Sequence, residues 1–272
     1  MKKVIIFGAA ALALAITAPQ AMATKAKKIK IGFVTTLSGG PGVIGKDMRN
    51  SVRIALDHLG NKMGGIPVEV IFEDDQVKPE VGKQKTEKLL HKDKVDIVSG
   101  FIWSHVVLAS RNSVVKAGKF LIISNAGTSK IAGRLCHKNI FSTSWQNDQV
   151  PMAMGEVLNK RGVKSLYVIA PNYAAGRDMV AGVERTFKGK ILGKDLTKWP
   201  TQLDFSAELA KARASKADGV FIFYPGRATN AFMRQYAQAG LTKTPLYSVF
   251  SVDSLSLPKL QQAKLTNVLG TF

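Results

Sequence analysis

The segment most typical of a cofactor site is the glycine-rich run 40–45, which reads GPGVIG and fits the pattern G-x-G-x-x-G. It lies between a predicted strand and a predicted helix, where such glycines let a dinucleotide approach a helix N-terminus. Glu73, Asp74 and Asp75 end the next predicted strand and are candidates for the ribose-binding acid. These acids lie further from the glycine-rich run than the roughly 20 residues at which that pattern places its acid. Pro41 also makes the loop stiffer. An NAD-dependent enzyme is therefore a remote alternative to a glycine-rich turn that receives an anion.

Catalytic and metal-binding side chains are sparse in this sequence. The histidines are far apart and form no H-E-x-x-H motif: His58, His91, His105 and His137. Cys136 is the single cysteine, and the chain has neither a G-x-S-x-G turn nor a P-loop. We expect a protein that binds a ligand rather than an enzyme, with no cofactor and no metal.

Two hydroxyl side chains follow predicted strand ends, where open α/β sheets receive ligands. Ser104 follows the strand that ends in SG, directly after Trp103, and Thr128 lies in the segment NAGTS after the next strand. Either hydroxyl alone is as consistent with helix capping as with binding. Together, and beside an indole, they favour a pocket that holds an anion at two helix starts.

Four aromatic residues of the second half lie at or just after strand ends: Trp145, Tyr173, Tyr224 and Phe250. Any one of them is more often a packing residue than a ligand contact. If all four face one cleft, they form an apolar pocket that accepts a ring.

From residue 28 onward, short apolar runs alternate with longer amphipathic ones, a pattern typical of βα units around parallel sheets. In the first half the predicted strands are Ile29–Thr35, Val68–Glu73, Asp96–Ser99 and Phe120–Ser124, and the predicted helices are Gly45–Leu59, Pro79–His91 and Ser104–Ala117. The first of these helices is expected to bury one stripe made of Val52, Ala55, Leu56 and Leu59.

The second half repeats this alternation. The predicted helices are Asn147–Lys160, Gly176–Phe187, Phe205–Ser215 and Ala228–Ala239, and the predicted strands are Ser165–Ala170, one near Ile191, Gly219–Phe223, one near Leu246 and the start of another at 267–272. Two α/β lobes joined near 142–146 fit this order better than one sheet.

The N-terminus is typical of an export signal. Lys2 and Lys3 precede an apolar run from Val4 to Thr17, and Ala21-Met22-Ala23 is a small-x-small cleavage site. The run is shorter than the roughly 20 residues that cross a bilayer. We expect cleavage after Ala23 and a mature protein in the periplasm.

Basic residues are in large excess, with 39 Lys and Arg against 19 Asp and Glu, for a net charge of +20. They are scattered through the predicted helices and turns, without a basic run interleaved with aromatics. We therefore expect a solvated basic surface and no nucleic-acid partner. Such a surface also raises the encounter rate with anionic ligands.

Seven segments stand in order along the chain: IKIGFVTTLSGGPGVIGKDM, GGIPVEVIFEDDQVKP, SGFIWSH, ISNAGTS, FSTSWQNDQ, APNYAAGRDMVAGV and FMRQYAQAGL. Together with the export signal, they resemble the leucine/isoleucine/valine-type periplasmic substrate-binding proteins of ABC transporters. The similarity covers essentially all of 28–272. It implies a type I binding-protein fold, in which two Rossmann-like lobes close on the ligand like a hinged trap.

The resemblance also implies site residues. Family members hold the ligand carboxylate at positions that match Ser104, Ala126 and Thr128 here. Members that bind amino acids place an acid where this chain has Phe250. A buried ammonium group left without a counter-charge is costly, so Phe250 argues against an amino-acid ligand. Asp253 is the alternative acid if the alignment shifts by a few residues.

The expected ligand is a carboxylate with an apolar or aromatic body, because SWQND and APNYAAGRDM look most like the subgroup that binds aromatic acids. The residues expected to flank its ring are Trp103, Trp145, Tyr173 and Tyr224, with Ile44 as apolar wall. The resemblance implies a monomer that delivers this ligand to a membrane permease. A branched-chain or other amino-acid binder and a ligand sensor of the same fold are the alternatives.

Domain boundaries follow from the same resemblance. Residues 1–23 are the signal peptide, 24–144 the first lobe, 145–268 the second lobe, and 269–272 the start of a crossover back to the first lobe. Family members continue well beyond this point, so we expect a truncated chain with an incomplete first lobe.

Overall fold

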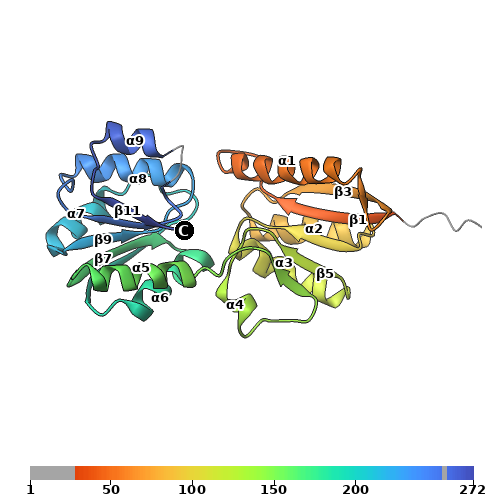
Figure 1. Cartoon of the computed structure of the whole chain (residues 1–272), viewed down its shortest axis with the longest axis horizontal. Helices are drawn as coiled ribbons and strands as arrows, with labels where there is room; N and C mark the ends of the chain where they lie inside the picture. Colours follow the sequence, from red (N-terminus) through yellow and green to blue (C-terminus); the bar gives the residue numbers. More distant parts are fainter. Residues whose placement is uncertain (1–27, 253–255) are drawn as a thin grey trace, which may run out of the picture.

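The computed structural model describes residues 28–252 and 256–272, which form two α/β lobes side by side (Figure 1). The predicted export signal at 1–23 and the alternative acid Asp253 lie outside the described residues. Within the described residues, every helix is too short or too polar to cross a bilayer.

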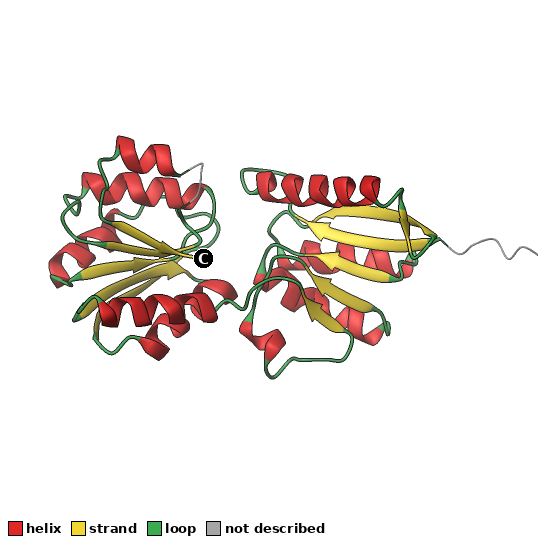
Figure 2. Cartoon of the chain, in the orientation of Figure 1, coloured by secondary structure: helices red, strands yellow, loops and turns green. Residues whose placement is uncertain are grey.

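The first lobe is a six-stranded sheet in the order β2-β3-β1-β4-β5-β6. Its strands are β1 (Ile29–Thr35), β2 (Lys62–Met63), β3 (Ile66–Asp74), β4 (Ile97–Gly100), β5 (Phe120–Ile123) and β6 (Ile140–Ser142), and its helices are α1 (Gly42–His58), α2 (Pro79–His91), α3 (Ser104–Lys116) and α4 (Ser129–Ala132). The short β2 pairs antiparallel with β3, and the other pairs are parallel. Figure 2 shows α1 on one face of this sheet and α2 with α3 on the other.

The second lobe is a five-stranded parallel sheet in the order β11-β10-β9-β7-β8. Its strands are β7 (Ser165–Pro171), β8 (Lys190–Thr197), β9 (Gly219–Ile222), β10 (Leu246–Val249) and β11 (Val268–Thr271), and its helices are α5 (Gln149–Lys160), α6 (Ala174–Thr186), α7 (Ser206–Ser215), α8 (Arg227–Gln238) and α9 (Leu257–Gln262). The arrowheads of both sheets point toward the junction between the lobes (Figure 2). The loops that leave the strands therefore meet at this junction.

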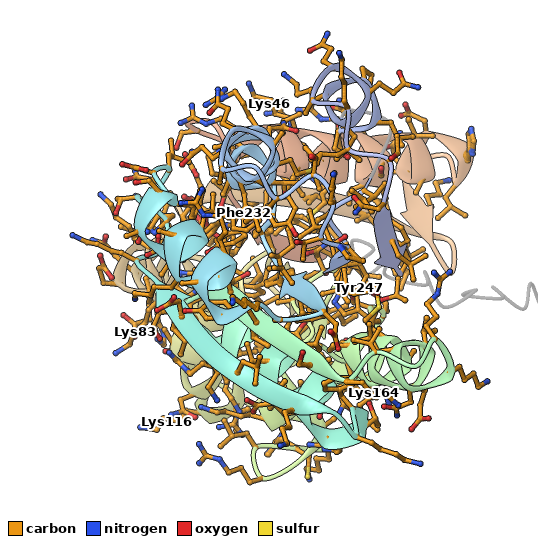
Figure 3. The ribbon with its side chains drawn as sticks, turned by 90° about the vertical axis from the view of Figure 1, so that its left-hand side faces the viewer. Lys46, Lys83, Lys116, Lys164, Phe232 and Tyr247 are labelled. Atoms are coloured by element: carbon orange, nitrogen blue, oxygen red, sulfur yellow. The ribbon has the colours of Figure 1, made fainter. Side chains whose placement is uncertain are left out.

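Continuous apolar strands make the core, as expected for parallel sheets covered on both faces. Every residue of β9 and β10 is buried. Figure 3 shows Phe232 and Tyr247 inside the second lobe, where they are 0% and 5% exposed. Lysines on separate elements lie outside, among them Lys46, Lys83, Lys116 and Lys164 (Figure 3). The positive charge is thus spread over the surface of both lobes.

The main predicted strands and helices are present, and the sequence did not predict the two shortest strands, β2 and β6, or the two shortest helices, α4 and α9. The final segment 267–272 does contain a strand, but β11 pairs with β10 in the second sheet. Residues 269–271 therefore extend the second lobe, where the resemblance predicted the start of a crossover.

Helix α1 departs from its prediction in two ways. It begins at Gly42 rather than Gly45, because the chain turns directly into the helix after Pro41. Its expected apolar stripe is not buried: Leu59 is 58% exposed, and Val52 and Leu56 are only partly covered. The helix contacts the lobe mainly through its first turns, where a Cβ on Gly45 would collide with the carbonyl oxygen of Thr36.

Candidate ligand-binding site

A hollow between the lobes, here named the large hollow, is a candidate site formed by the described residues. Its empty volume is about 960 Å³, including space open to solvent. The first lobe supplies Gly40, Pro41, Val43, Ile44 and Trp103, and the second lobe supplies Trp199, Pro200, Leu203, 225–230, Phe250, Ser251 and Ser256. The glycine-rich run 40–45, which contains the start of α1, and the segments after β4, β8, β9 and β10 thus meet around one space.

Trp103 is fixed on the first-lobe side by a buried polar chain. It ends the loop after β4, and its indole N–H donates to the hydroxyl of Thr36 at 2.7 Å. Thr36 in turn donates to the Asp75 carboxylate, which also accepts the N–H of Val77 at 2.9 Å. Burial raises the pKa of Asp75, and the hydrogen bonds from Thr36 and Val77 offset this only in part. An ionisable group therefore sets the orientation of an indole that lines the hollow.

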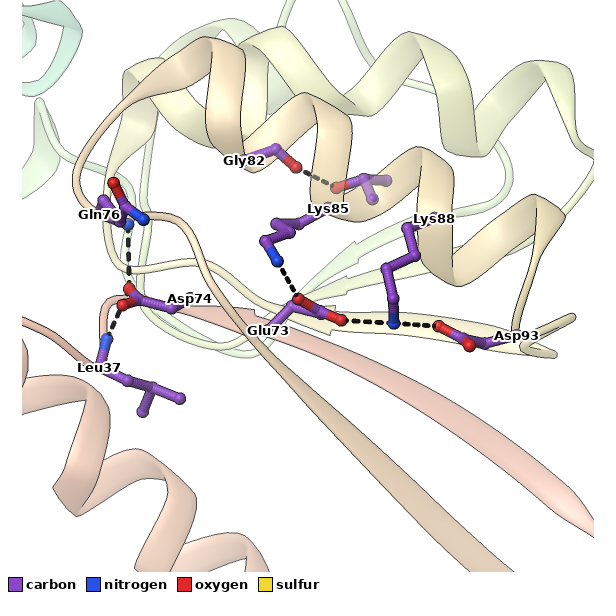
Figure 4. Close-up of polar contacts among 9 residues, drawn as sticks. Leu37, Glu73, Asp74, Gln76, Gly82, Lys85, Lys88 and Asp93 are labelled. Atoms are coloured by element: carbon purple, nitrogen blue, oxygen red, sulfur yellow. Dashed lines mark hydrogen bonds and ion pairs between the residues drawn. The ribbon is translucent and has the colours of Figure 1, made fainter.

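The neighbouring acids after β3 serve the first lobe's own structure. Glu73 accepts hydrogen bonds from Lys85 at 2.8 Å and from Lys88 at 2.6 Å (Figure 4). Burial raises the pKa of Glu73, but these two ammonium groups lower it by more, so it lies below its usual range. Glu73 is engaged as an ion-pair acceptor rather than as a ribose-binding acid.

Asp74 holds two loops together at the same sheet edge. It accepts the backbone N–H of Leu37 at 2.9 Å and that of Gln76 at 3.0 Å (Figure 4). Burial raises the pKa of Asp74, while hydrogen bonds from Ser38, Leu37 and Gln76 lower it by more. Asp74 thus fixes the segment that leads from β1 to the glycine-rich loop.

Stacked rings form the floor of the hollow where the two lobes meet. Trp199, after β8, lies 5.4 Å from Trp103 and 5.1 Å from Tyr173, measured between ring centroids. Tyr173 is only 6% exposed and also packs 6.4 Å from Phe223. Tyr173 therefore supports Trp103 and Trp199 from behind, while these two indoles line the space itself.

A second hollow lies on the first-lobe side, beside the crossover between the lobes. It is lined by Ala126, Thr128 and Trp145, together with parts of β5, β6 and α4. The hydroxyl of Thr128 is buried and has no hydrogen-bond partner. The backbone N–H of Ala126 is already used, because it donates to the carbonyl of Phe101 at 2.9 Å. The Thr128 hydroxyl is therefore available to accept or donate a hydrogen bond to a ligand.

Ser104 belongs to a hydrogen-bonded chain that joins the lobes. The side-chain amide of Asn147 donates to the Ser104 hydroxyl at 3.0 Å and to Asp178 at 3.2 Å. Asp178, on α6, also accepts the N–H and the hydroxyl of Ser129 at 3.1 and 3.0 Å. A second-lobe carboxylate thus caps the start of a first-lobe helix.

The structure brings most of the predicted site residues to the junction, in different roles. Ile44, Trp103 and Phe250 line the large hollow, and Ala126, Thr128 and Trp145 line the second one. Tyr224 instead lies inside the second lobe, 1% exposed, with its ring 4.9 Å from Phe205 and 5.5 Å from Phe232. Its hydroxyl shares a 2.7 Å hydrogen bond with Thr197.

Sequence reasoning missed Trp199, Arg227 and Asn230, which also line the large hollow. Trp199 follows β8, a strand that the sequence located only roughly. Arg227 follows the Pro225-Gly226 turn directly after β9, so its position at a strand end was an available signal.

The described residues contain no group of three or more His, Cys, Asp or Glu side chains that could hold a metal ion. Cys136 is a free, exposed cysteine. What the site offers is aromatic walls, a few hydroxyls and one guanidinium, which suits binding of a small organic molecule.

Two doubly wound lobes with a hollow at their junction define the class as a two-lobed binding protein. The family model described as "Periplasmic binding protein" matches residues 28–272. The chain belongs to this family, which implies a periplasmic location.

Relatives and solved structures agree with this family. "Leu/Ile/Val-binding protein homolog 6" of Brucella abortus is 28% identical over 281 residues, covering 100% of this chain and 70% of its own length. An ABC transporter substrate-binding protein from Sphaerobacter thermophilus is 30% identical with a TM-score of 0.77, over 87% of this chain and 67% of that one. A solute-binding protein of an R. palustris ABC transporter, solved with benzoate, is 28% identical with a TM-score of 0.81, over 86% and 65%.

These relatives are substrate-binding proteins of ABC transporters and not enzymes, as the scarcity of catalytic side chains predicts. The chain spans about two thirds of the length of the solved structures that it matches. Proteins of this class bind small molecules and deliver them to membrane permeases.

Proposed function

We propose that this chain binds a small organic acid with an aromatic or apolar body in the hollow between its lobes and presents it to an ABC permease. The observation that carries the proposal is the character of the lining. Among the described residues that line the hollow, none is acidic, and the walls include Ile44, Trp103, Trp199 and Phe250. Such a lining favours a ring and offers no counter-charge to an ammonium group.

The carboxylate is proposed to lie on the first-lobe side, where the resemblance places Ser104, Ala126 and Thr128. The unpaired hydroxyl of Thr128 supports this, because a buried hydroxyl without a partner is uncommon in proteins. Trp145 lies between this group and the large hollow, since it lines the second hollow and stacks on Phe250. Movement of Trp145 is the step that would join the two spaces around a ligand.

The solved relative with benzoate supports an aromatic acid. The Brucella relatives, by their names, support the second candidate, a branched-chain amino acid. The two candidates differ in one chemical group, because an α-amino acid brings an ammonium that needs an acceptor or a carboxylate.

Closure is proposed as a shift from open to closed forms, with ligand contacts from both lobes supplying the preference. The contacts of Asp178 with Ser129 and of Asn147 with Ser104 already join the lobes in this structure. The ligand then needs to add only part of the free energy of closure.

A thermal-shift screen tests the proposed ligand class, because a ligand that binds only the native state raises the melting temperature. The panel contains benzoate, 4-hydroxybenzoate and cyclohexanecarboxylate against leucine, valine and glutamate. We expect stabilisation by the ring acids alone. Stabilisation by leucine or valine, without an effect of the ring acids, would refute the proposal in favour of the second candidate.

Export and oligomeric state complete the proposal. We propose cleavage after Ala23 and a monomeric mature protein. Intact mass of the periplasmic protein locates the cleavage site, and light scattering after size exclusion gives the oligomeric state. A mass that retains 1–23, or a stable dimer, would contradict these two points.

A further inference from the structure

Arg227 is the charged residue among those that line the large hollow. Arg227 is exposed, and its guanidinium takes part in none of the ion pairs among the described residues. A guanidinium pairs best with a carboxylate, which accepts two parallel N–H bonds from its planar fork. An unpaired guanidinium in a pocket without acids is therefore a candidate partner for an anionic ligand group.

The path of the chain brings Arg227 to the cleft. It is the first residue of α8, directly after Gly226, whose φ is 63°. Its side chain extends to the first lobe, where a Cβ on Gly40 would lie 2.9 Å from its Cδ and 3.0 Å from its Nε. Gly40 thus leaves the room that this side chain occupies, and Arg227 spans one end of the hollow from lobe to lobe.

Two further polar atoms in the same lining lack partners. The indole N–H of Trp199 is a buried donor without an acceptor, and the side-chain oxygen of Asn230 is a buried acceptor without a donor. Asn230 lies three residues after Arg227 on α8, and so on the same face of the helix. Buried polar groups normally find partners, so these two atoms offer hydrogen bonds to a polar group that enters this end of the hollow.

From these observations we propose that Arg227, with the Trp199 indole, binds a second anionic group of the ligand. This rests on the proposed function, in which the first carboxylate lies on the first-lobe side. The two anion-binding groups of residues then lie on opposite sides of an apolar wall made of Trp103 and Phe250. The favoured ligand class is a ring or short apolar body that carries acidic groups at both ends.

The test compares benzene-1,4-dicarboxylate with benzoate, by isothermal titration, in the wild-type protein and in Arg227→Gln. We expect wild type to bind the dicarboxylate at least tenfold more tightly than benzoate. Arg227→Gln loses at least tenfold in dicarboxylate affinity and changes benzoate affinity less than threefold. Arg234→Gln, on the same helix but outside the lining of the large hollow, keeps both affinities.

Trp199→Phe keeps the ring and removes the N–H, so it should weaken the dicarboxylate more than benzoate. Equal losses for both ligands in Arg227→Gln would mean that Arg227 binds the single carboxylate of benzoate. This result would refute the proposed second anion site, but not the proposal that the protein binds aromatic acids. Unchanged dicarboxylate binding in Arg227→Gln also overturns the inference alone. Failure of every ring acid to bind wild type overturns the inference and the proposed function together.

Discussion

The indole of Trp145 stacks on the ring of Phe250, with centroids 4.5 Å apart and planes 30° apart. Trp145 belongs to the crossover between the lobes, and Phe250 follows β10 of the second lobe. Phe250 has a φ of 55°, a value uncommon outside glycine, and its N–H is held by the carbonyl of Thr271 at 3.1 Å. The backbone thus holds an aromatic ring at the wall between the two hollows.

Replacing Phe250 by Glu should abolish the preference for ring acids. A carboxylate in this wall repels an anionic ligand and removes the stacking surface of Trp145. We expect the affinity for benzoate, measured by isothermal titration, to fall at least tenfold.

Phe250→Tyr is the matched control, because it keeps a ring at the same backbone position. Its benzoate affinity should stay within threefold of wild type. Wild-type affinity for benzoate in Phe250→Glu would show that this wall does not contact the ligand.

Replacing Thr128 by Val separates binding from stability. The hydroxyl has no partner in the protein, so its removal should leave the free energy of unfolding unchanged or slightly higher. A carboxylate held by this hydroxyl loses one hydrogen bond, which lowers its binding free energy by about 1–3 kcal/mol. Denaturant unfolding and titration with benzoate measure the two effects separately.

Ser110 provides the control for Thr128. Its hydroxyl is also buried and unpaired, but it lies on α3 and lines neither hollow. Ser110→Ala should leave ligand affinity unchanged. If Thr128→Val also binds benzoate like wild type, the carboxylate does not lie at Thr128.

Replacing Asp178 by Ala should favour the open form. The change removes three hydrogen bonds that join α6 to Ser129 and Asn147. We expect a larger radius of gyration without ligand, and a lower ligand affinity because closure becomes more costly. Small-angle X-ray scattering with and without ligand measures this change.

Asp218→Ala is the control for the loss of a capping carboxylate. Asp218 accepts the N–H groups of Lys164 and Ser165 within the second lobe and makes no contact across the junction. Its replacement should lower stability without changing the radius of gyration. An unchanged radius in Asp178→Ala would mean that this contact does not hold the lobes together.

Asp75 should contribute stability that decreases as the pH rises. Its pKa is raised in the folded protein, chiefly by burial, so the folded state binds this proton more tightly than the unfolded state. The resulting stabilisation is fully present below the unfolded pKa of about 3.9 and is lost as the pH rises through the folded pKa. Asp75→Asn removes this contribution, which urea unfolding at pH 4.5 and pH 7.5 detects.

Asp74 should give the opposite dependence of stability on pH. Its pKa is lowered, so its stabilisation is present at neutral pH and is lost as the pH falls through the folded value. Asp74→Asn should therefore lower stability more at pH 7.5 than at pH 3, which lies below the ordinary aspartate pKa of about 3.9. For Asp75, the same dependence of stability on pH in Asp75→Asn and in wild type would show that Asp75 keeps an ordinary pKa.

The fold was largely predictable, because long apolar strands and amphipathic helices carry strong periodic signals. β1 and α2 have the bounds that the pattern predicts. The two-residue β2 and the four-residue α4 carry too little pattern to be predicted. The prediction of a buried stripe on α1 was wrong, because periodicity predicts an apolar face but not whether the lobe covers that face. Leu59 therefore stays exposed.

The candidate site was only partly predictable, since strand ends identify loops but not the direction of a side chain. Trp103 and Phe250 follow strands and do line the hollow. Tyr224 also follows a strand, but its ring turns into the second-lobe core against Phe205 and Phe232. The contact between Arg227 and Gly40 joins residues far apart in sequence, which only the arrangement of the lobes reveals.

Titration of one protein preparation with benzoate and with leucine tests the proposed ligand class directly. All three tryptophans of the chain, Trp103, Trp145 and Trp199, line the two hollows, so intrinsic fluorescence reports binding beside the calorimetric signal. We expect saturable binding of benzoate with a change in tryptophan emission, and no binding of leucine. Saturable binding of leucine, with neither a fluorescence change nor a calorimetric signal from benzoate, would contradict the proposed ligand class.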